Sequence, residues 1–173
     1  VRIMPERVVR HSQEDLEHLK TGLLEMGGLA EHRVRAAVDG LVARDTAVIT
    51  GVLGADGPLN QLHIEIDNRC FTLLALHQPM AVDLRAIVAA VKINTDLERV
   101  GDLAINIAEA ATLYLRHPPV KALVDIPRMG ALAQTMLRDA LDAYVRRDTE
   151  LAQAVLEADD EVDALKSQRL PEL

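Results

Sequence analysis

The sequence is poor in aromatic residues, glycine, proline and cysteine. Phe, Trp and Tyr make up 2% of its 173 residues, with no Trp at all, beside 9 Gly, 7 Pro and a single Cys. Sheet proteins usually show aromatic and β-branched residues in short alternating runs, and none appear here. One cysteine makes no internal disulfide, and no apolar run approaches the roughly 18 residues of a membrane span. Sheet-rich, disulfide-stapled and membrane-spanning proteins are therefore excluded.

Positive charge is also in deficit. Lys and Arg total 19 against 27 Asp and Glu, a formal net charge of −8. Nucleic-acid surfaces and anionic membranes select basic patches, so we expect neither nucleic-acid binding nor membrane insertion. Because the lone Cys70 suits a reducing compartment and the opening residues Val1 to Met4 are too short for a secretory signal, we expect a cytoplasmic protein.

What the chain does contain is an internal duplication. Shifting the sequence by 103 residues aligns positions 26–62 with 129–165, and 16 of the 37 pairs are identical. Self-similarity of this length indicates two copies of one structural unit. The bulk composition of Ala, Leu, Val, Arg, Glu and Asp consists largely of helix formers, so the repeated unit is expected to be helical.

Gly and Pro punctuate the expected helices. We expect a long helix from about Pro5 to Ala43, a short one from Asp45-Thr46 to Gly54, and a third from about Asp56 to His77. A fourth should run from Ala81 to about Arg116 and close the first repeat at 117–119. The second repeat should start near Ile126-Pro127, turn at 147–149 and offer a third stretch from Asp160.

The fold class expected is therefore all-α, with two tandem three-helix bundles. The first repeat covers 5–117 and the second covers 122–173. A partner of the 81–116 helix would begin near position 184, so the second bundle is expected to lack its last helix and to expose an apolar groove. We expect that the natural protein is longer.

The 81–116 helix carries an unusual acidic pair. Glu98 and Asp102 are one turn apart on a face whose other members include Ile87, Val91 and Ile105, and no cation of that helix shares the face. Buried like charges are costly unless something positive lies between them. A divalent or trivalent metal bound by carboxylate oxygens would resolve the conflict. Gly101, between the two acids, predicts a close-packed neighbouring helix.

Duplication supplies a second pair. Asp159 and Asp163 are again four residues apart, and Asp56 and Asn60 occupy the matching places in the first repeat. Carboxylates from two helices can together surround a metal cluster, although acidic pairs at this spacing are usually solvated surface. We interpret Asn94 and Asn106 as helix-surface residues, and the six His residues receive no role.

Two segments of the sequence resemble the PhoU family of phosphate-transport regulators. They are the QPxAxDLR segment, residues 78–85, and the DLERVGDxAxNIAE segment, residues 96–109; the stretch LLEMGGLAE at 23–31 is also similar. The resemblance implies two tandem three-helix bundles of about 220 residues in total. It also implies a regulator without enzymatic activity, which restrains the phosphate-specific ABC transporter and signals phosphate sufficiency to a sensor histidine kinase.

The resemblance further implies clusters of iron or zinc held by E(D)xxxD motifs. Carried over, these motifs fall on Glu98/Asp102 and Asp159/Asp163, with Asp56/Asn60 as the third place, where Asn60 departs from the acidic pattern. Asp83 and Arg85 in the first segment become candidate contacts to a partner protein or between helices. We expect a homodimer, although an exposed groove could by itself cause association.

Two alternatives stay open. A PhoU-like accessory protein could serve another ion transporter, which sequence separates weakly from the first interpretation. A ferritin-like carboxylate metalloprotein also places acids on bundled helices, but that class uses Glu-x-x-His pairs, and the chain contains none.

Overall fold

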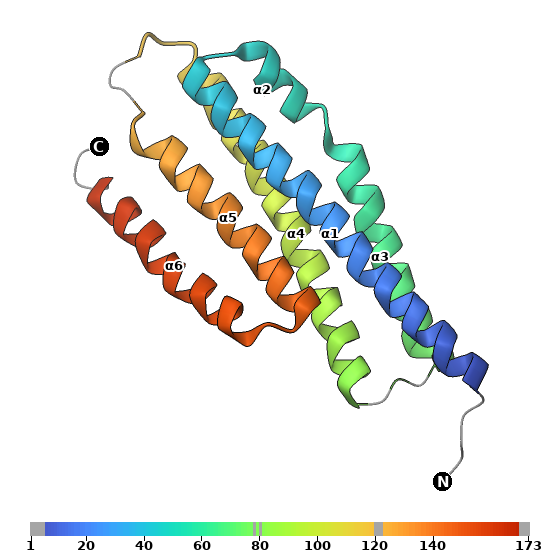
Figure 1. The fold of residues 1–173 in the computed structure, drawn as a ribbon. Helices are drawn as coiled ribbons and strands as arrows, with labels where there is room; N and C mark the ends of the chain where they lie inside the picture. The colour runs from blue at the N-terminus through green and yellow to red at the C-terminus, as the bar shows by residue number, and fades with distance from the viewer. Residues whose placement is uncertain (1–5, 78, 80, 120–122, 170–173) are drawn as a thin grey trace.

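The computed structural model describes residues 6–77, 79, 81–119 and 123–169. Within these ranges every regular element is an α-helix, and no strand occurs (Figure 1). The elements are α1 (Glu6–Ala43), α2 (Thr46–Leu53), α3 (Asp56–His77), α4 (Ala81–Tyr114), α5 (Asp125–Arg146) and α6 (Thr149–Arg169). The predicted all-α class is confirmed. The predicted helix start at Pro5 lies outside the described residues.

The turn that follows the first helix of each repeat, α1 or α5, has the same conformation in both repeats. Arg44 and Arg147, which are equivalent under the duplication, have left-handed backbones with φ of 56° and 58°. Asp45 then accepts hydrogen bonds from the backbone N–H groups of Ala47 and Val48 (2.9 and 3.1 Å), and Asp148 accepts one from Leu151 (2.9 Å). Side-chain acceptors at this position satisfy the unpaired donors that begin a helix.

The second half of each repeat differs. In the first repeat Gly54 separates α2 from α3, as predicted. In the second repeat α6 runs without interruption through the place where a separate stretch from Asp160 was predicted. The residues equivalent to Gly54, Gly57 and Pro58 are Glu157, Asp160 and Glu161. Without glycine or proline to break the hydrogen-bond ladder, the two shorter helices merge.

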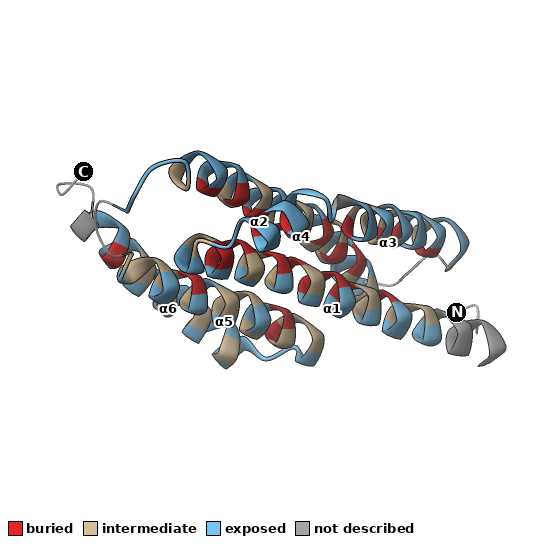
Figure 2. Cartoon of the chain, turned by 90° about the horizontal axis from the view of Figure 1, so that it is seen from above, coloured by how far each residue is buried: buried red, intermediate tan, exposed pale blue. Residues whose placement is uncertain are grey.

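Helix α1 is the centre of the molecule. It packs against α2, α3 and α4 on one side and against α5 on the other, while α6 lies on the outer side of α5 (Figures 1 and 2). The predicted boundary between the repeats, at 117–122, falls in the segment between α4 and α5.

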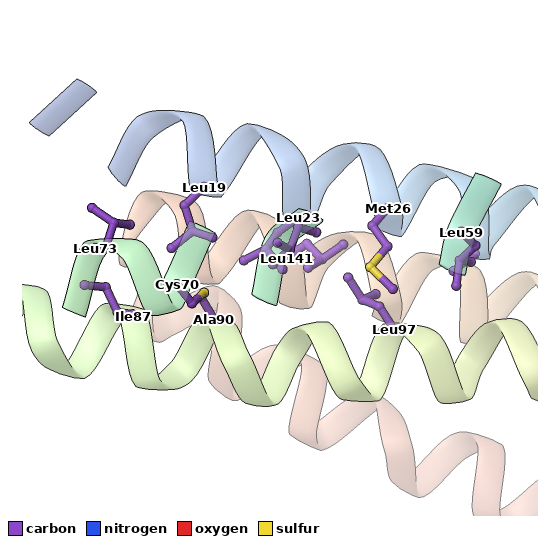
Figure 3. Packing of buried hydrophobic residues seen from close by; sticks show 12 residues of the cluster. Leu19, Leu23, Met26, Leu59, Cys70, Leu73, Ile87, Ala90, Leu97 and Leu141 are labelled. Carbon is purple, nitrogen blue, oxygen red and sulfur yellow. The ribbon is translucent and has the colours of Figure 1, made fainter. Parts of the chain in front are cut away.

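The core is built around two stripes of buried residues, one on α1 and one on α4, that face each other. Buried residues of α1 recur at intervals of three and four, at positions 19, 23, 26, 30, 33 and 37, and those of α4 recur in the same way at 87, 90, 94, 97, 101, 104, 108 and 111. Figure 3 shows the large side chains of the first stripe, including Leu19, Leu23 and Met26, packed with those of α3, α4 and α5. This spacing keeps one helix face against its neighbours over many turns.

The interface between the repeats has an internal pseudo-two-fold symmetry. Gly27 of α1 lies against Leu141 of α5, and the equivalent Gly130 of α5 lies against the equivalent Val38 of α1. The two contacts join the same pair of structural positions with the two repeats exchanged. Such reciprocal contacts are characteristic of isologous dimer interfaces. The duplicated units therefore face each other as two subunits of a symmetric dimer would.

Polar residues repeat the pattern. Arg138 of α5 donates to both carboxylate oxygens of Glu31 on α1, and the equivalent Arg35 donates to Oε1 of Gln134, the equivalent of Glu31, at 2.9 Å. Arg35 also pairs with Glu31 within α1, at 2.6 Å. The hydrogen bonds from Arg138 are the main reason that the pKa of Glu31 is lowered below its ordinary value.

Candidate functional site

The acidic pair of α4 lies at the edge of the buried stripe. Glu98 is half-buried, following the buried Leu97, whereas Asp102 is exposed, following the buried Gly101. The sequence-based prediction placed Asp102 on the same helical face as Ile87, which is buried. In the structure the buried face of α4 lies beside both acids and includes neither of them.

Gly101 marks the close approach that was predicted for it. A Cβ atom added there would lie 3.0 and 3.2 Å from the δ-carbons of Leu59 on α3 and 3.3 Å from Nη1 of Arg33 on α1. These distances are tighter than ordinary van der Waals contact. Gly101 thus lets α4 approach both α1 and α3 beside the acidic pair.

Arg33 is a functional candidate that the sequence analysis missed. Its side chain is buried, with 6% exposure, and its Nη2 donates a hydrogen bond to the carbonyl oxygen of Ala55, directly before α3. Arg33 occupies a regular position of the α1 stripe, where its neighbours Ala30 and Ala37 are both fully buried. A charged residue at a position where the helical spacing predicts a buried apolar one is the signal by which the sequence could have identified Arg33 as buried.

Helices α3 and α4 run side by side through this region. Nδ2 of Asn94 donates to the carbonyl oxygen of His63 and to Oδ1 of Asp67, both at 2.9 Å, and Leu59 lies at Gly101. This antiparallel register places Asn60, between Leu59 and His63, at the level of Glu98 on α4. Asn60 is half-buried; the side chain of Asp56 lies outside the described part of the structure.

The interpretation of Asn94 as a surface residue is wrong. Asn94 is fully buried within the α4 stripe, because its amide satisfies a backbone carbonyl and a carboxylate that α3 presents. Nε2 of His63 lies 3.8 Å from Oδ2 of Asp67, so the imidazole belongs to the same polar group. Asn106 is exposed, as predicted.

The second acidic pair stands apart from the first. Asp159 and Asp163 are both exposed on α6, which packs against α5, whereas Glu98 and Asp102 lie on α4, which packs against α1, α2 and α3. The structure brings Asn60 to the level of Glu98 but does not unite the two repeats' acids in one cluster.

The first repeat fits an iron or zinc cluster poorly. Among the described residues, no group of three or more His, Cys, Asp or Glu side chains could hold a metal ion. Asn60 is neutral, and the buried Arg33 guanidinium already brings a positive charge beside Gly101. Metal ligation by Glu98, Asp102, Asp159 and Asp163 stays a prediction.

Asp83 and Arg85 lie near the start of α4; Arg85 lines a groove, and Asp83 lines a neighbouring hollow that shares Lys20 and Arg147 with it. Asp83 is in the first turn of the helix, where the helix dipole favours a carboxylate. Arg85 borders a groove of about 590 Å³ whose other charged residues include Lys20, Arg147 and Asp148. Ala140, Ala143, Val155 and Leu156 are among the small and apolar residues of the same groove.

The lining of this groove is mostly small and apolar. Leu156 of α6 is 67% exposed in it. Of the two predicted partner-contact residues, Arg85 therefore lines an apolar surface that also carries Lys20 and Arg147, an arrangement that suits a protein partner. Their contact with a partner stays a prediction.

The remaining strongly perturbed groups have structural causes. Burial raises the pKa of the Cys70 thiol to about 11 and that of the Tyr144 hydroxyl to about 12. The Tyr144 hydroxyl donates to the carbonyl oxygen of Ala86 at 2.8 Å, which ties α5 to the first turns of α4. No described helix is long and apolar enough to cross a membrane.

Comparison with known proteins agrees with this architecture. The PhoU domain family matches residues 23–111 and 126–169. The phosphate-specific transport system accessory protein PhoU homolog of Caulobacter vibrioides is 43% identical over 92% of this chain and 70% of its own length. The homologue from Aquifex aeolicus is 37% identical over 92% of this chain and 72% of its own length.

Two solved structures share the fold. The crystal structure of PhoU from Pseudomonas aeruginosa superposes with a TM-score of 0.87 at 36% identity, over 92% of this chain and 77% of that one. The phosphate transport system regulatory protein PhoU from Streptococcus pneumoniae gives a TM-score of 0.80 at 28% identity, over 89% of this chain and 72% of that one. The helical architecture, its internal duplication and these similarities together show that the chain belongs to the PhoU family.

Proposed function

We propose that this protein is a cytoplasmic negative regulator of phosphate uptake and of phosphate-regulon signalling. It binds the phosphate-specific ABC transporter and the sensor histidine kinase, and it holds the kinase in its phosphatase-favouring state when phosphate is plentiful. The observation that carries the proposal is the 43% identity, over 92% of the chain, to a protein named as an accessory component of phosphate-specific transport.

The surface supports a binding role. Arg85 lines the groove on α5 and α6, and Asp83 lines the hollow next to it, so charged and apolar contacts are available together. The shifted pKa values belong to the buried Cys70, to the half-buried Tyr144 and to the Glu31–Arg138 ion pair. Because these groups serve packing and the repeat interface, they support a regulator rather than an enzyme.

The experiment is complementation. The gene, in its full-length form, is expressed in a strain that lacks its own PhoU-type regulator and grows in high phosphate, and alkaline phosphatase activity is measured. The proposal requires repression of that activity. Persistently high activity from abundant, folded protein would favour the alternative role at another ion transporter.

A matched pair of variants then addresses the surface. D83K/R85E reverses the charge of Arg85 in the groove and that of Asp83 in the neighbouring hollow, and it is expected to abolish repression. R128E/E161K, which reverses both charges of an exposed ion pair between α5 and α6 outside this groove, serves as the matched control and should repress normally. Equal repression by both variants would place the partner contact elsewhere.

A further inference from the structure

The groove on α5 and α6 has a covered counterpart in the first repeat. Three of the residues that line the groove are equivalent, under the 103-residue shift, to buried residues of the first repeat. The pairs are Ala140 and Ala37, Ala152 and Ile49, and Val155 and Val52. The first-repeat member of each pair is at most 4% exposed, whereas Ala140 and Ala152 are exposed and Val155 is half-buried. The same surface is therefore covered in one repeat and open in the other.

A helix covers this surface in the first repeat. The three first-repeat residues form one buried cluster with three alanines of α4, which are Ala104, Ala108 and Ala111. Because these alanines are four and three positions apart, they lie on one face of α4. Small side chains at such a contact let two helices pack at short distance. The surface thus fits a helix that presents a stripe of small residues.

An arginine holds the end of the covering helix. Arg44 donates from Nη2 to the carbonyl oxygens of Leu115 and His117, at 3.2 and 2.6 Å, directly after the last residue of α4. Its guanidinium also lies 5.5 Å from the centre of the Tyr114 ring. The last carbonyl groups of a helix have no partner within the helix, and a cation beside them is favoured by the helix dipole. Arg44 therefore fixes where α4 ends on this surface.

The second repeat keeps that arginine. Arg147 is equivalent to Arg44 and has the same left-handed backbone, with φ of 58° against 56°. It lines the groove together with Ala152 and Val155. Both parts of the surface that receives α4, the apolar face and the cation at its end, therefore recur on α5 and α6.

We propose that the groove receives a helix of the full-length protein, placed one repeat after α4, and that Arg147 binds the carbonyl groups at the end of that helix. The helix presents small residues to Ala140, Ala152 and Val155, as α4 does to their equivalents. The relatives are long enough to contain it, because this chain spans 70% and 72% of the length of the Caulobacter and Aquifex homologues. The inference does not rest on the proposed function, since Asp83 and Arg85 belong to α4 and their contact with a partner is tested separately.

Thiol labelling tests where the helix lies. A152C and A154C are made in this 173-residue chain and in the full-length protein; residue 152 lines the groove, and residue 154 is exposed outside it. The native Cys70 is buried. A disulfide-exchange reagent should label A152C at least tenfold more slowly in the full-length protein than in the shorter chain, and it should label A154C equally fast in both. Equal rates for A152C would overturn the proposal. Protection of A152C that disappears upon dilution would also overturn it, because a second copy would then cover the groove.

Melting temperatures test the role of Arg147. R44A should lower the melting temperature of both forms by at least about 3 °C, because it removes hydrogen bonds from a charged donor. R147A should produce a similar decrease in the full-length protein alone. R146A is the control, since Arg146 pairs with Asp142 outside the groove, and it should affect both forms equally. A full-length R147A that melts at the wild-type temperature, or an equal decrease in both forms, would show that Arg147 does not hold the end of a helix.

Discussion

The glycines at the interface between the repeats allow a sharp test of the packing. Gly27 and Gly28 are adjacent in the middle of α1, yet only one of them faces α5. A Cβ at Gly27 would lie 2.1 Å from Cδ1 of Leu141, whereas nothing lies within 4 Å of a Cβ at Gly28. Leu141 is 5% exposed, so its methyl group has little room to move.

The expected magnitudes follow from two opposing terms. Gly→Ala within a helix stabilises by about 0.5–1 kcal/mol, and this gain should appear undiminished in G28A. In G27A an overpacking cost of about 1–3 kcal/mol opposes it. We therefore expect G28A to be more stable than G27A by about 1–3 kcal/mol, which is about 2–4 °C in melting temperature for each kcal/mol.

Urea denaturation followed by circular dichroism measures both variants against the wild type. Because the two substitutions are chemically identical and adjacent in sequence, differences in helix propensity and in the unfolded state largely cancel. Equal stabilisation of G27A and G28A would refute the close α1–α5 contact and, with it, the symmetric packing of the repeats.

Three further results are expected. The pKa of Glu31 is lowered in the folded protein, so its ion pair stabilises the fold at pH values above about 4.3, the ordinary pKa of glutamate, and this stabilisation is lost as the pH falls further. E31Q should therefore make the free energy of unfolding less dependent on pH in that acidic range. An unaltered pH dependence would contradict the role of Arg138. Cys70 is fully buried with a pKa of about 11, so a disulfide-exchange reagent at pH 8 should label it only upon unfolding; rapid labelling of the native protein would contradict its burial. N94A removes a buried donor from the carbonyl oxygen of His63 and from Asp67 and should cost about 1–3 kcal/mol in denaturant unfolding, whereas a neutral result would place the asparagine at the surface.

Helix order could be predicted from the sequence because its causes are local. Asp45 at a helix start and Gly54 at a helix end act within one turn of the chain, and the predicted positions agree with α2. The continuity of α6 could have been predicted from the same chemistry, since Glu157 replaces Gly54 in the second repeat. The duplication favoured a helix break at the equivalent position of the second repeat, but the glycine and proline residues that cause the break are absent there.

The environment of the acids could not be predicted from their own helix. Spacing on α4 placed Glu98 and Asp102 one turn apart, but the guanidinium that lies against Gly101 between them belongs to Arg33 of α1, 65 positions before Glu98 in the sequence. Arg33 on α1 and Asn94 on α4 each occupy a position in a stripe of otherwise apolar buried residues. Such interruptions indicate buried polar residues, while the partners that satisfy them depend on tertiary register.

Direct binding tests the central claim that this protein regulates by contact with the phosphate transport system. The purified protein, in its full-length form, is titrated against the phosphate-specific ABC transporter in nanodiscs, with an unrelated ABC transporter as the control. Saturable binding to the phosphate transporter alone, weakened at least tenfold by D83K/R85E, is the predicted result. Absence of binding, or equal binding to both transporters, would contradict the account.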